Sequence, residues 1–237
     1  MDGWQIELLH ALDMASDENV IFGLILEASL ALGFNYCAYG LQIPYPLSSP
    51  KAIMLNNYPQ SWRERYSNAR YLATDPTILQ GRQSERPILW NDQLYAETPE
   101  LWEEARGFGL CKGLSQSRLN AGGTGGMLTV ARTDGDISER ELHHNGEKLQ
   151  WLASTAHSAL WGILTKRHRT AEDPDLTDRE REILRWTADG KSAGEIADLL
   201  TVSKNTIDFH IKNAIRKLQT ANKTAAVVRA ALLGLLF

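Results

Sequence analysis

The sequence predicts an α+β fold made of two domains, and three observations support this prediction. Aromatic, alternating segments lie between helical patterns in the first two thirds of the 237 residues. The stretch KRHRTAEDPD at 166–175 is polar, charged and interrupted by proline, which is typical of a linker. Beyond it, only helical patterns occur. We therefore expect an N-terminal domain at 1–165 and a C-terminal domain at 176–237.

The composition indicates a folded protein without a membrane segment. Hydrophobic residues make up 43% of the chain and charged residues 23%, as in ordinary globular proteins. No apolar run approaches the roughly 18 residues that a membrane span requires. The first ten residues, MDGWQIELLH, lack the basic and then apolar pattern of a signal peptide. We therefore expect a cytoplasmic protein with no membrane partner.

Two helices are expected to open the chain. Apolar residues recur at helical spacing from Trp4 to Ala15, and Ser16 is a candidate N-cap for a second helix that ends at Gly33. The next segment, FNYCAYGLQ at 34–42, is aromatic and alternates with a period of two, which predicts a strand.

The remainder of the N-terminal domain combines strands with helices. AIML at 52–55 predicts a second strand, and KGLSQSRL and MLTVAR, joined by the turn AGGTGG, predict a hairpin. Pro59 and Pro99 each mark the first turn of a short helix. Ser138 and Glu141 form a capping box for a long helix. A mainly antiparallel sheet with helices on both faces is the expected architecture.

The C-terminal domain is expected to contain four helices, the last of them after Asn222. Five residues are candidate caps of the first three: Thr177 with Glu180, Ser192 with Glu195, and Ser203. EIADLL, the turn TVS and KNTIDFHIKNAIRKL predict a helix-turn-helix. The expected core consists of apolar residues from all of these segments: Ile183, Leu184, Trp186, Ile196, Leu199, Leu200, Ile207, Ile211, Ile215 and Leu218.

Charge is distributed unevenly along the chain. Residues 1–174 contain 15 basic and 21 acidic residues, a net charge of −6, whereas residues 199–237 contain 6 and 1, a net charge of +5. An acidic body with a basic end is typical of a protein that binds a polyanion through its last elements. We therefore expect double-stranded DNA as a partner.

The second helix of the helix-turn-helix has an apolar side and a polar side. At about 100° per residue, Ile207, Ile211 and Leu218 share one side. The candidate DNA-binding residues lie in the same helix: Lys204, Asn205, Thr206, Asp208, Phe209, Lys212, Asn213 and Arg216. A solvated polar surface is the alternative, but the local charge and the turn spacing favour a helix that enters the major groove.

Asp208 is an acid within this basic helix, and two interpretations of it remain open. Its carboxylate could pair with Lys212, four residues later, and orient that lysine towards DNA. It could instead accept a hydrogen bond from the N4 amino group of cytosine. The position of Asp208 beside the apolar side favours pairing.

The segment LTDREREILRWTADGKSAGEIADLLTVSKNTIDFHIKNAIRKL resembles the DNA-binding domain of LuxR-type transcription factors, with Glu180, Leu184 and Gly190 at characteristic positions. NYPQSWRERY, TDP, ILWND and GGMLTVAR, in this order, resemble the autoinducer-binding domain of the acyl-homoserine-lactone receptors of quorum sensing. The resemblance implies an α-β-α sandwich, a homodimer and DNA sites with two-fold symmetry. RNA polymerase is a further expected partner of such a regulator.

The resemblance also implies a set of pocket residues. They are Tyr58, Trp62, Tyr66, Asp75, Trp90, Trp102 and Thr129. An acyl-homoserine lactone has a ring carbonyl, an amide N–H, an amide carbonyl and an apolar tail. Trp62 suits the ring carbonyl as a donor, Asp75 suits the amide N–H as an acceptor held extended by Pro76, and Tyr58 and Thr129 suit the amide carbonyl.

Structural roles remain open for several of these residues. Tyr66 and Trp90 are expected as pocket walls and Trp102 as one closed side, but each position also suits an ordinary core aromatic residue. Thr129 also suits an ordinary strand position. The intact Trp62 and Tyr66 favour an acyl-homoserine lactone over another small molecule, because some relatives with other signals replace this tryptophan.

Catalysis and metal binding are not expected. None of the six histidines has a metal-ligand spacing, and Cys37 and Cys111 suit buried small apolar positions. AGGTGG lacks the lysine and hydroxyl residue of a phosphate-binding loop. We expect no cofactor besides the signal molecule. The alternative function is a stand-alone receptor that acts as a repressor or responds to a different small molecule.

Overall fold

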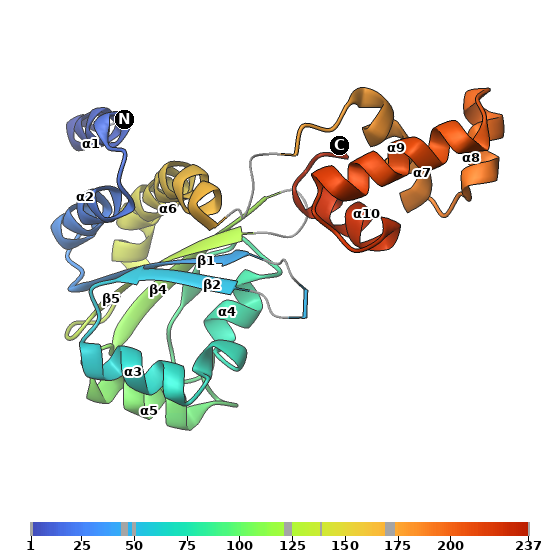
Figure 1. The fold of residues 1–237 in the computed structure, drawn as a ribbon. Coiled ribbons are helices and arrows are strands. Elements are labelled where there is room, and N and C mark those ends of the chain that lie inside the picture. Colours follow the sequence, from blue (N-terminus) through green and yellow to red (C-terminus); the bar gives the residue numbers. More distant parts are fainter. Residues whose placement is uncertain are drawn as a thin grey trace. The chain divides into compact units, whose positions relative to one another are not determined.

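The computed structural model describes residues 2–43, 47–48, 51–120, 125–137, 139–168 and 174–236. Contacts divide the chain into two compact units (Figure 1). The first contains Met1–Ile43, Lys51–Asn120 and Gly125–His168, and the second contains Arg169–Phe237. The α+β class is confirmed. The linker at 166–175 stays a prediction, because residues 169–173 lie outside the described residues.

An antiparallel sheet forms the middle layer of the N-terminal unit. Its strands are β1 (Tyr36–Ile43), β2 (Lys51–Asn56), β3 (Ile88–Leu89), β4 (Lys112–Leu119) and β5 (Gly125–Arg132). They are ordered β2-β1-β5-β4-β3. In this register Thr129 of β5 lies between Ala38 of β1 and Ser115 of β4. The predicted hairpin is therefore β4 and β5, although residues 121–124 of its turn lie outside the described residues.

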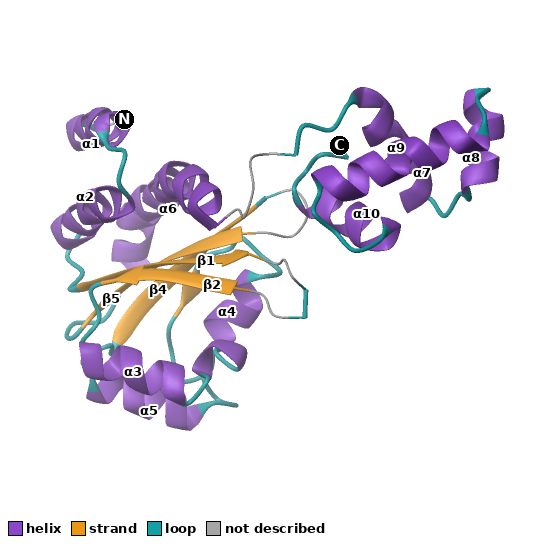
Figure 2. Ribbon diagram, in the orientation of Figure 1, coloured by secondary structure: helices purple, strands orange, loops and turns teal. Residues whose placement is uncertain are grey.

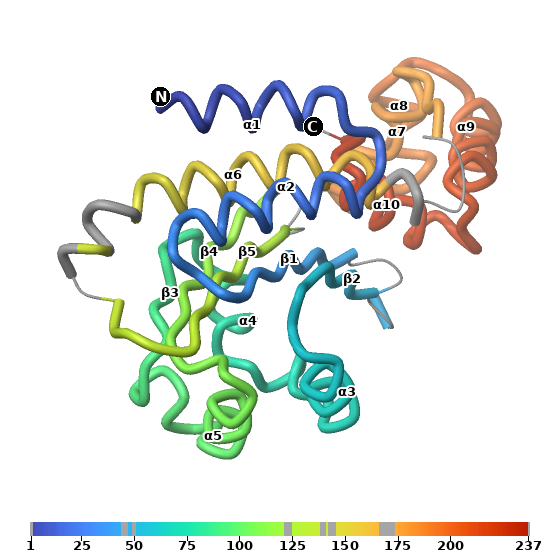
Figure 3. The backbone as a smooth tube through the Cα atoms, turned by 90° about the vertical axis from the view of Figure 1, so that its left-hand side faces the viewer, coloured from blue at the N-terminus to red at the C-terminus, as the bar shows by residue number. Residues whose placement is uncertain are grey.

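Helices cover both faces of this sheet, as predicted (Figure 2). One face carries α1 (Gly3–Met14), α2 (Glu18–Ala31) and α6 (Glu139–His168). The other carries α3 (Gln60–Asn68), the short 3-10 helix η1 (Tyr71–Ala73), α4 (Pro76–Gly81) and α5 (Pro99–Gly107). Figure 3 shows α6 running beside α2 on one side of the strands, with α3 and α5 on the opposite side. This arrangement is the α-β-α sandwich that the resemblance implied.

The two faces have different cores. Aliphatic residues dominate between the sheet and the α2–α6 layer, where Ile25, Leu152 and Leu160 are fully buried. Burial of each such side chain contributes about 1.5–3 kcal/mol. The opposite face is lined by an aromatic cluster. Cys37 lies in the aliphatic core, and burial raises the pKa of its thiol to about 12. Cys111 is only half-buried, contrary to expectation.

Several local expectations differ from the structure. The N-cap of α2 is Asp17 and not Ser16, because the Asp17 carboxylate accepts the backbone N–H of Asn19 and Val20. Pro59 is the N-cap of α3, one position before its first turn. The sequence analysis predicted neither α4, η1 nor β3, which are all six residues or shorter. Ser138, the predicted cap of α6, lies outside the described residues.

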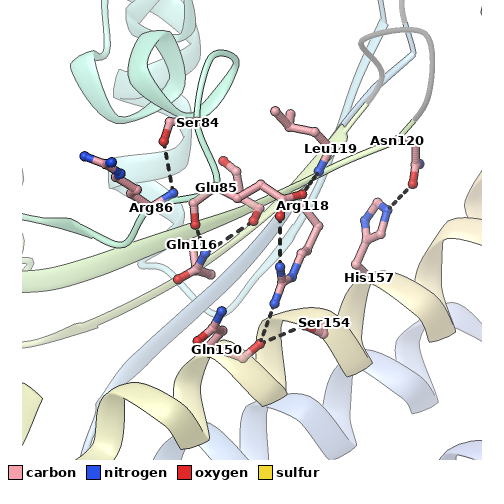
Figure 4. Close-up of polar contacts among 11 residues, drawn as sticks. Ser84, Glu85, Arg86, Gln116, Arg118, Leu119, Asn120, Gln150, Ser154 and His157 are labelled. Carbon is pink, nitrogen blue, oxygen red and sulfur yellow. Dashed lines mark hydrogen bonds and ion pairs between the residues drawn. The ribbon is translucent and has the colours of Figure 1, made fainter. Parts of the chain in front are cut away.

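A polar network joins the end of β4 to α6 (Figure 4). The Glu85 carboxylate accepts the backbone N–H of Leu119 and pairs with Arg118 at 3.0 Å. The His157 ring lies between the Tyr39 hydroxyl, at 2.9 Å from Nδ1, and the Asn120 carbonyl, at 3.2 Å from Nε2. The short β3 pairs with β4 only at Leu114 and Ser115. Glu85 thus accepts the backbone N–H of Leu119 in the part of β4 that extends past this pairing.

The C-terminal unit contains four helices, as predicted. They are α7 (Asp178–Ala188), α8 (Ala193–Leu200), α9 (Lys204–Lys217) and α10 (Lys223–Leu232). Both predicted capping boxes and the Ser203 cap are present. Thr201 ends α8 in the left-handed conformation, with φ of 54°. The helix-turn-helix is therefore confirmed as α8, the turn at 201–203, and α9.

Nine of the ten residues predicted for the core of this unit are buried or pack against it half-buried, and Leu176, Ala226, Ala230 and Leu236 join it without having been predicted. Ile183, Leu184, Ile196 and Ile207 are completely buried, whereas Leu199 is 52% exposed. The expectation for Leu199 was wrong because the buried side of the short α8 is set by Ile196 and Ala197, and Leu199 lies outside it. Among the described residues, no helix is long and apolar enough to cross a membrane.

Candidate functional site

An aromatic cluster lies between the sheet and the helices α3 to α5. Six of the seven predicted ligand-binding residues come from aromatic or acidic positions on this side, and Thr129 comes from β5. The most deeply buried are Trp62, Trp102, Asp75, Trp90 and Thr129, at 3%, 5%, 8%, 8% and 8% exposure. Tyr58 and Tyr66 are half-buried and pack against the same cluster. The structure therefore brings the predicted set together.

Asp75 is the acceptor of this region. Its extended backbone, with ψ of 115°, agrees with the effect expected of Pro76, and it also serves as the N-cap of α4. Its Oδ1 accepts the backbone N–H and the hydroxyl of Thr77, at 2.9 and 2.7 Å, and its Oδ2 accepts the Tyr66 hydroxyl at 2.8 Å. The carboxylate is therefore already hydrogen-bonded within the protein. Oδ2 retains capacity for one more donor.

Two donors of the aromatic cluster have no acceptor among the described residues. Within the described part of the chain, the Tyr58 hydroxyl and the Trp62 indole N–H donate to no residue. A tryptophan N–H is a donor only, and such groups usually have a partner when buried. Trp62 instead contacts other rings, with Tyr66 at 5.7 Å and Phe108 at 5.4 Å between ring centroids. These donors can serve a bound molecule.

Trp90 and Thr129 are joined by a chain of hydrogen bonds. The Trp90 indole N–H donates to the Ser115 hydroxyl at 3.0 Å, and that hydroxyl lies 3.0 Å from the Thr129 hydroxyl. When Ser115 donates to Thr129, the Thr129 hydrogen is free for another acceptor. Trp90 therefore offers only its ring to the site, whereas Thr129 can also offer a donor.

Trp102 forms one side of the cluster. Its indole N–H donates to Asp92 at 2.7 Å, and its ring stacks on Tyr95 with centroids 4.7 Å apart and planes 1° apart. Tyr95 is 4% exposed and also meets Trp90 edge-on at 6.1 Å. Tyr95 was not among the residues predicted for this site. No periodicity marks it, because it lies in a loop, and only its spacing of five residues after Trp90 could have suggested it.

The tyrosines of this region remain neutral. Burial and the neighbouring Asp75 charge raise the pKa of Tyr58, Tyr66 and Tyr95 above the usual phenol value. Burial also raises the pKa of Asp75, although hydrogen bonds from Thr77 and Tyr66 oppose the shift. The hydroxyls are therefore hydrogen-bond donors. One acceptor, several donors and flat apolar walls suit a small molecule that combines an amide or ester head with an apolar tail.

Among the described residues, no group of three or more histidine, cysteine, aspartate or glutamate side chains could hold a metal ion. The side chains of His143 and His144 lie outside the described set.

The outer side of α9 is the second candidate site. Ile207, Ile211, Ala214 and Leu218 face the core. Five of the eight predicted DNA-binding residues are exposed, namely Lys204, Asn205, Phe209, Lys212 and Arg216, and the other three are half-buried, namely Thr206, Asp208 and Asn213. Phe209 is 60% exposed, which is unusual for an aromatic residue on a small domain.

Thr206 and Asp208 have partners inside α9. The backbone N–H of Thr206 donates to the Ser203 hydroxyl at 3.1 Å, so this residue takes part in the N-cap. The Asp208 carboxylate lies 3.6 Å from the Lys204 ammonium. The sequence had favoured a pair between Asp208 and Lys212. The structure corrects this: the pair forms with the preceding lysine, and Lys212 is exposed.

Comparisons with known families agree with both sites. Residues 17–160 match the family described as autoinducer binding domain, and residues 174–230 match bacterial regulatory proteins of the luxR family. The first range includes every residue of the aromatic cluster described above, and the second includes α9 entirely.

Several relatives match this chain over its whole length. The transcriptional activator protein AnoR of Acinetobacter nosocomialis is 42% identical over 238 residues, which cover 100% of each chain. The crystal structure of Escherichia coli SdiA is 31% identical, with a TM-score of 0.83 over 99% of this chain and 98% of that chain. SdiA in complex with octanoyl-rac-glycerol is 32% identical, with a TM-score of 0.82 over 98% and 95%. The chain therefore belongs to the LuxR family of quorum-sensing transcription factors, which are regulators and not enzymes.

Proposed function

We propose that the aromatic cluster binds an N-acyl-homoserine lactone and that the chain regulates transcription in response to it. One observation carries the proposal: the Trp62 indole N–H and the Tyr58 hydroxyl are donors with no acceptor among the described residues, in the same cluster as a buried carboxylate that can accept one more hydrogen bond. A lactone of this class offers two carbonyl acceptors and one amide donor, which complements these three groups.

Each group of the ligand has a proposed partner. Trp62 donates to the lactone carbonyl, Asp75 Oδ2 accepts the amide N–H, and Tyr58 and Thr129 donate to the amide carbonyl. Tyr66 holds the Asp75 carboxylate through its 2.8 Å hydrogen bond. The rings of Tyr66, Trp90 and Trp102 form the walls, with the indole N–H groups of both tryptophans already satisfied. In this proposal each of the seven residues has the role that the sequence resemblance implied.

An acylglycerol is a second candidate ligand. One solved structure, of SdiA in complex with octanoyl-rac-glycerol, is 32% identical to this chain. A monoacylglycerol has an ester carbonyl for Trp62 or Tyr58 but hydroxyl groups in place of the amide N–H, so Asp75 would accept a hydroxyl. The neutral head and single apolar tail are common to both classes, and the test below separates them.

The regulatory mechanism follows from ligand linkage. A ligand that binds only the folded N-terminal unit stabilises it, by ~2.7 kcal/mol at a concentration of 100 times Kd. We propose that the occupied chain acts as a cytoplasmic homodimer on two-fold symmetric promoter DNA, with the two α9 helices in major grooves about 34 Å apart. AnoR is named a transcriptional activator, which favours activation through RNA polymerase. A repressor is the alternative.

Ligand titration of the purified full chain tests the proposal. The ligands are N-acyl-homoserine lactones with acyl chains of increasing length and 1-octanoylglycerol, and binding is measured by calorimetry. We expect the tightest binding from a lactone, and a roughly tenfold loss in Trp62→Phe, which keeps the ring and removes one hydrogen bond worth ~1.4 kcal/mol.

Trp4→Phe is the matched control for this experiment. Trp4 also contacts another ring, Trp151 at 5.3 Å, but it lies in α1 on the opposite face of the sheet. We expect its affinity for every ligand to equal that of the wild type. Tighter binding of 1-octanoylglycerol than of any lactone would select the second candidate, and binding of neither class would reject a ligand of this type.

A further inference from the structure

The two helices that cover the aromatic cluster have an inner and an outer side. Trp62 and Tyr66 of α3 and Trp102 of α5 belong to the cluster. Arg65 of α3 and Glu104 of α5 lie at the surface, with side-chain exposures of 44% and 27%. Residues that face the proposed ligand and residues that join the helices are therefore one turn or less apart on the same elements.

Arg65 and Glu104 form a bidentate pair across these helices. Arg65 Nε donates to Glu104 Oε2 at 2.8 Å, and Arg65 Nη2 donates to Glu104 Oε1 at 2.7 Å. The Tyr71 hydroxyl of η1 donates to the same Oε2 at 3.0 Å. The guanidinium lies 5.8 Å from the centre of the Tyr71 ring. We call Arg65, Glu104 and Tyr71 the α3–α5 latch.

The geometry of the latch distinguishes it from an ordinary surface ion pair. Single exposed pairs contribute little to stability, whereas bidentate arginine pairs within a network contribute more. Arg65 also faces Glu100, one turn earlier on α5, but at 3.7 Å and with 78% of the Glu100 side chain exposed. Only the Glu104 contact is bidentate and shared with a third element. Consistently, hydrogen bonds from Arg65 lower the pKa of Glu104.

The latch is connected to the ligand site through the rings beneath it. The Tyr71 ring lies 6.2 Å from Trp62 and 5.9 Å from Tyr66. Phe108, which directly follows α5, lies 5.4 Å from Trp62. Because α3 carries both Trp62 and Tyr66, a separation of α3 from α5 would move two proposed ligand contacts and open the covered side of the cluster.

We propose that Glu104 is a positioning residue that, with Arg65 and Tyr71, keeps α3 closed against α5 and thereby slows both entry and release of the signal molecule. The proposal rests on the proposed function of the cluster. The latch is formed by protein groups alone, so it stabilises the closed state of the empty and of the occupied protein to a similar extent. Its loss should then raise both rate constants and leave Kd nearly unchanged.

The experiment measures exchange of lactone from the full chain. The probe is the isotopically labelled N-acyl-homoserine lactone that binds the wild type most tightly, chased with excess unlabelled lactone. We expect Glu104→Gln to raise the dissociation and association rate constants by about fivefold each, with Kd changed by less than about twofold. Trp62→Phe, which removes a ligand contact, should raise only the dissociation rate constant.

Glu100→Gln is the matched control, because it removes an equal charge on the same helix beside the same arginine. We expect wild-type rates from it. The charge-exchanged double variant Arg65→Glu with Glu104→Arg should recover slow exchange. Added salt should accelerate exchange in the wild type but not in Glu104→Gln, because the attraction is screened only where it exists.

Three results would overturn the proposal: unchanged rates in Glu104→Gln, equal acceleration in Glu100→Gln, or a raised Kd with an unchanged association rate constant. If Glu104→Gln does not yield folded protein, Tyr71→Phe decides, because it removes one of the three hydrogen bonds and should accelerate exchange by about twofold. Absence of any lactone or acylglycerol binding in the wild type would instead reject the proposed function.

Discussion

His157 lies in α6 with its ring between Tyr39 of β1 and Asn120, the residue that follows β4. In the neutral ring with its proton on Nε2, Nε2 donates to the Asn120 side-chain carbonyl and Nδ1 accepts the Tyr39 hydroxyl. This tautomer satisfies both ring nitrogens. A protonated ring would require Tyr39 to accept instead of donate. Burial and the charge of Arg118 favour the neutral ring.

We predict that acidification destabilises the N-terminal unit through His157. Burial, and then the charge of Arg118, lower the pKa of His157, while Glu85 opposes the shift. The unfolded chain, with an ordinary histidine pKa of about 6.5, binds the proton more readily than the folded protein. Stability is therefore fully present above about pH 6.5 and is lost as the pH falls below it.

Urea unfolding of the wild type and His157→Gln between pH 7.5 and 5.5 measures this effect. Glutamine can hydrogen-bond but does not titrate, so its stability should fall less over this range than that of the wild type. His10→Gln is the control, since His10 is exposed in α1 and makes no contact in this network. Equal pH dependence in the wild type and His157→Gln would contradict the prediction.

For Asp208, the sequence predicted an ion pair but not the correct partner. An acid in a basic helix indicates a local ion pair, and the pair is present. Its partner depends on side-chain geometry at the start of α9, where Lys204 follows the N-cap directly. The pair leaves Lys212 exposed, and Lys212 therefore remains available to a phosphate.

The Trp90 ring packs directly against the backbone of β4 at Gly113. A Cβ on Gly113 would lie 2.6 Å from two atoms of the indole ring, which is closer than real Cβ contacts allow. The ring is also fixed by its hydrogen bond to Ser115, two residues further along β4. Neither the strand backbone nor the ring can move away easily.

We predict that Gly113→Ala destabilises the N-terminal unit and weakens lactone binding. Overpacking of this kind costs roughly 1–3 kcal/mol, which lowers the unfolding temperature of a domain of this size by about 2–12 °C. Gly40→Ala is the matched control: Gly40 also lies within a strand of this sheet, but a Cβ there meets nothing within 4 Å. Thermal unfolding and calorimetric titration of both variants check the prediction, and equal behaviour of the two would contradict it.

The elements predicted correctly from sequence depend on local interactions, whereas those that were missed depend on tertiary contacts. The capping boxes at Thr177 and Ser192 are local, since each involves side chains three residues apart, and both were predicted. By contrast, α4, η1 and β3 are too short for a periodic pattern, and they depend on tertiary contacts. Asp75 illustrates this dependence, because its role as the N-cap of α4 also involves Tyr66 from α3.

In the ligand site, too, the sequence identified the residues but not the tertiary contacts between them. The resemblance in sequence located all seven candidate residues in or beside one cluster. The hydrogen bonds that separate their roles join residues distant along the chain, such as Trp90 with Ser115, and could not be predicted from spacing. Tyr95 was missed for the same reason, because its stacking on Trp102 is a property of the folded loop.

At the scale of the whole molecule, the two units have separate cores and opposite charges. The aliphatic and aromatic cores consist of residues before position 165, whereas the cores around Leu184 and Ile196 consist of residues after position 175. Net charge is −6 over residues 1–174 and +2 over residues 175–237, with the positive charge concentrated in the last 39 residues, which carry +5. Each unit can therefore respond to its own ligand, a neutral small molecule or polyanionic DNA.

We predict that the full chain unfolds in two calorimetric transitions and that a saturating lactone raises only one of them. Ligand at 100 times Kd contributes ~2.7 kcal/mol to the unit that binds it, which corresponds to a shift of roughly 5–11 °C for a domain of about 160 residues. Differential scanning calorimetry with and without lactone measures both transitions. The transition of the C-terminal unit, assigned with the isolated fragment 174–237, should stay within about 1 °C, because its core shares no residue with the ligand site. A single transition, or equal shifts of both, would mean that the units unfold together and that lactone binding is coupled to the stability of α9.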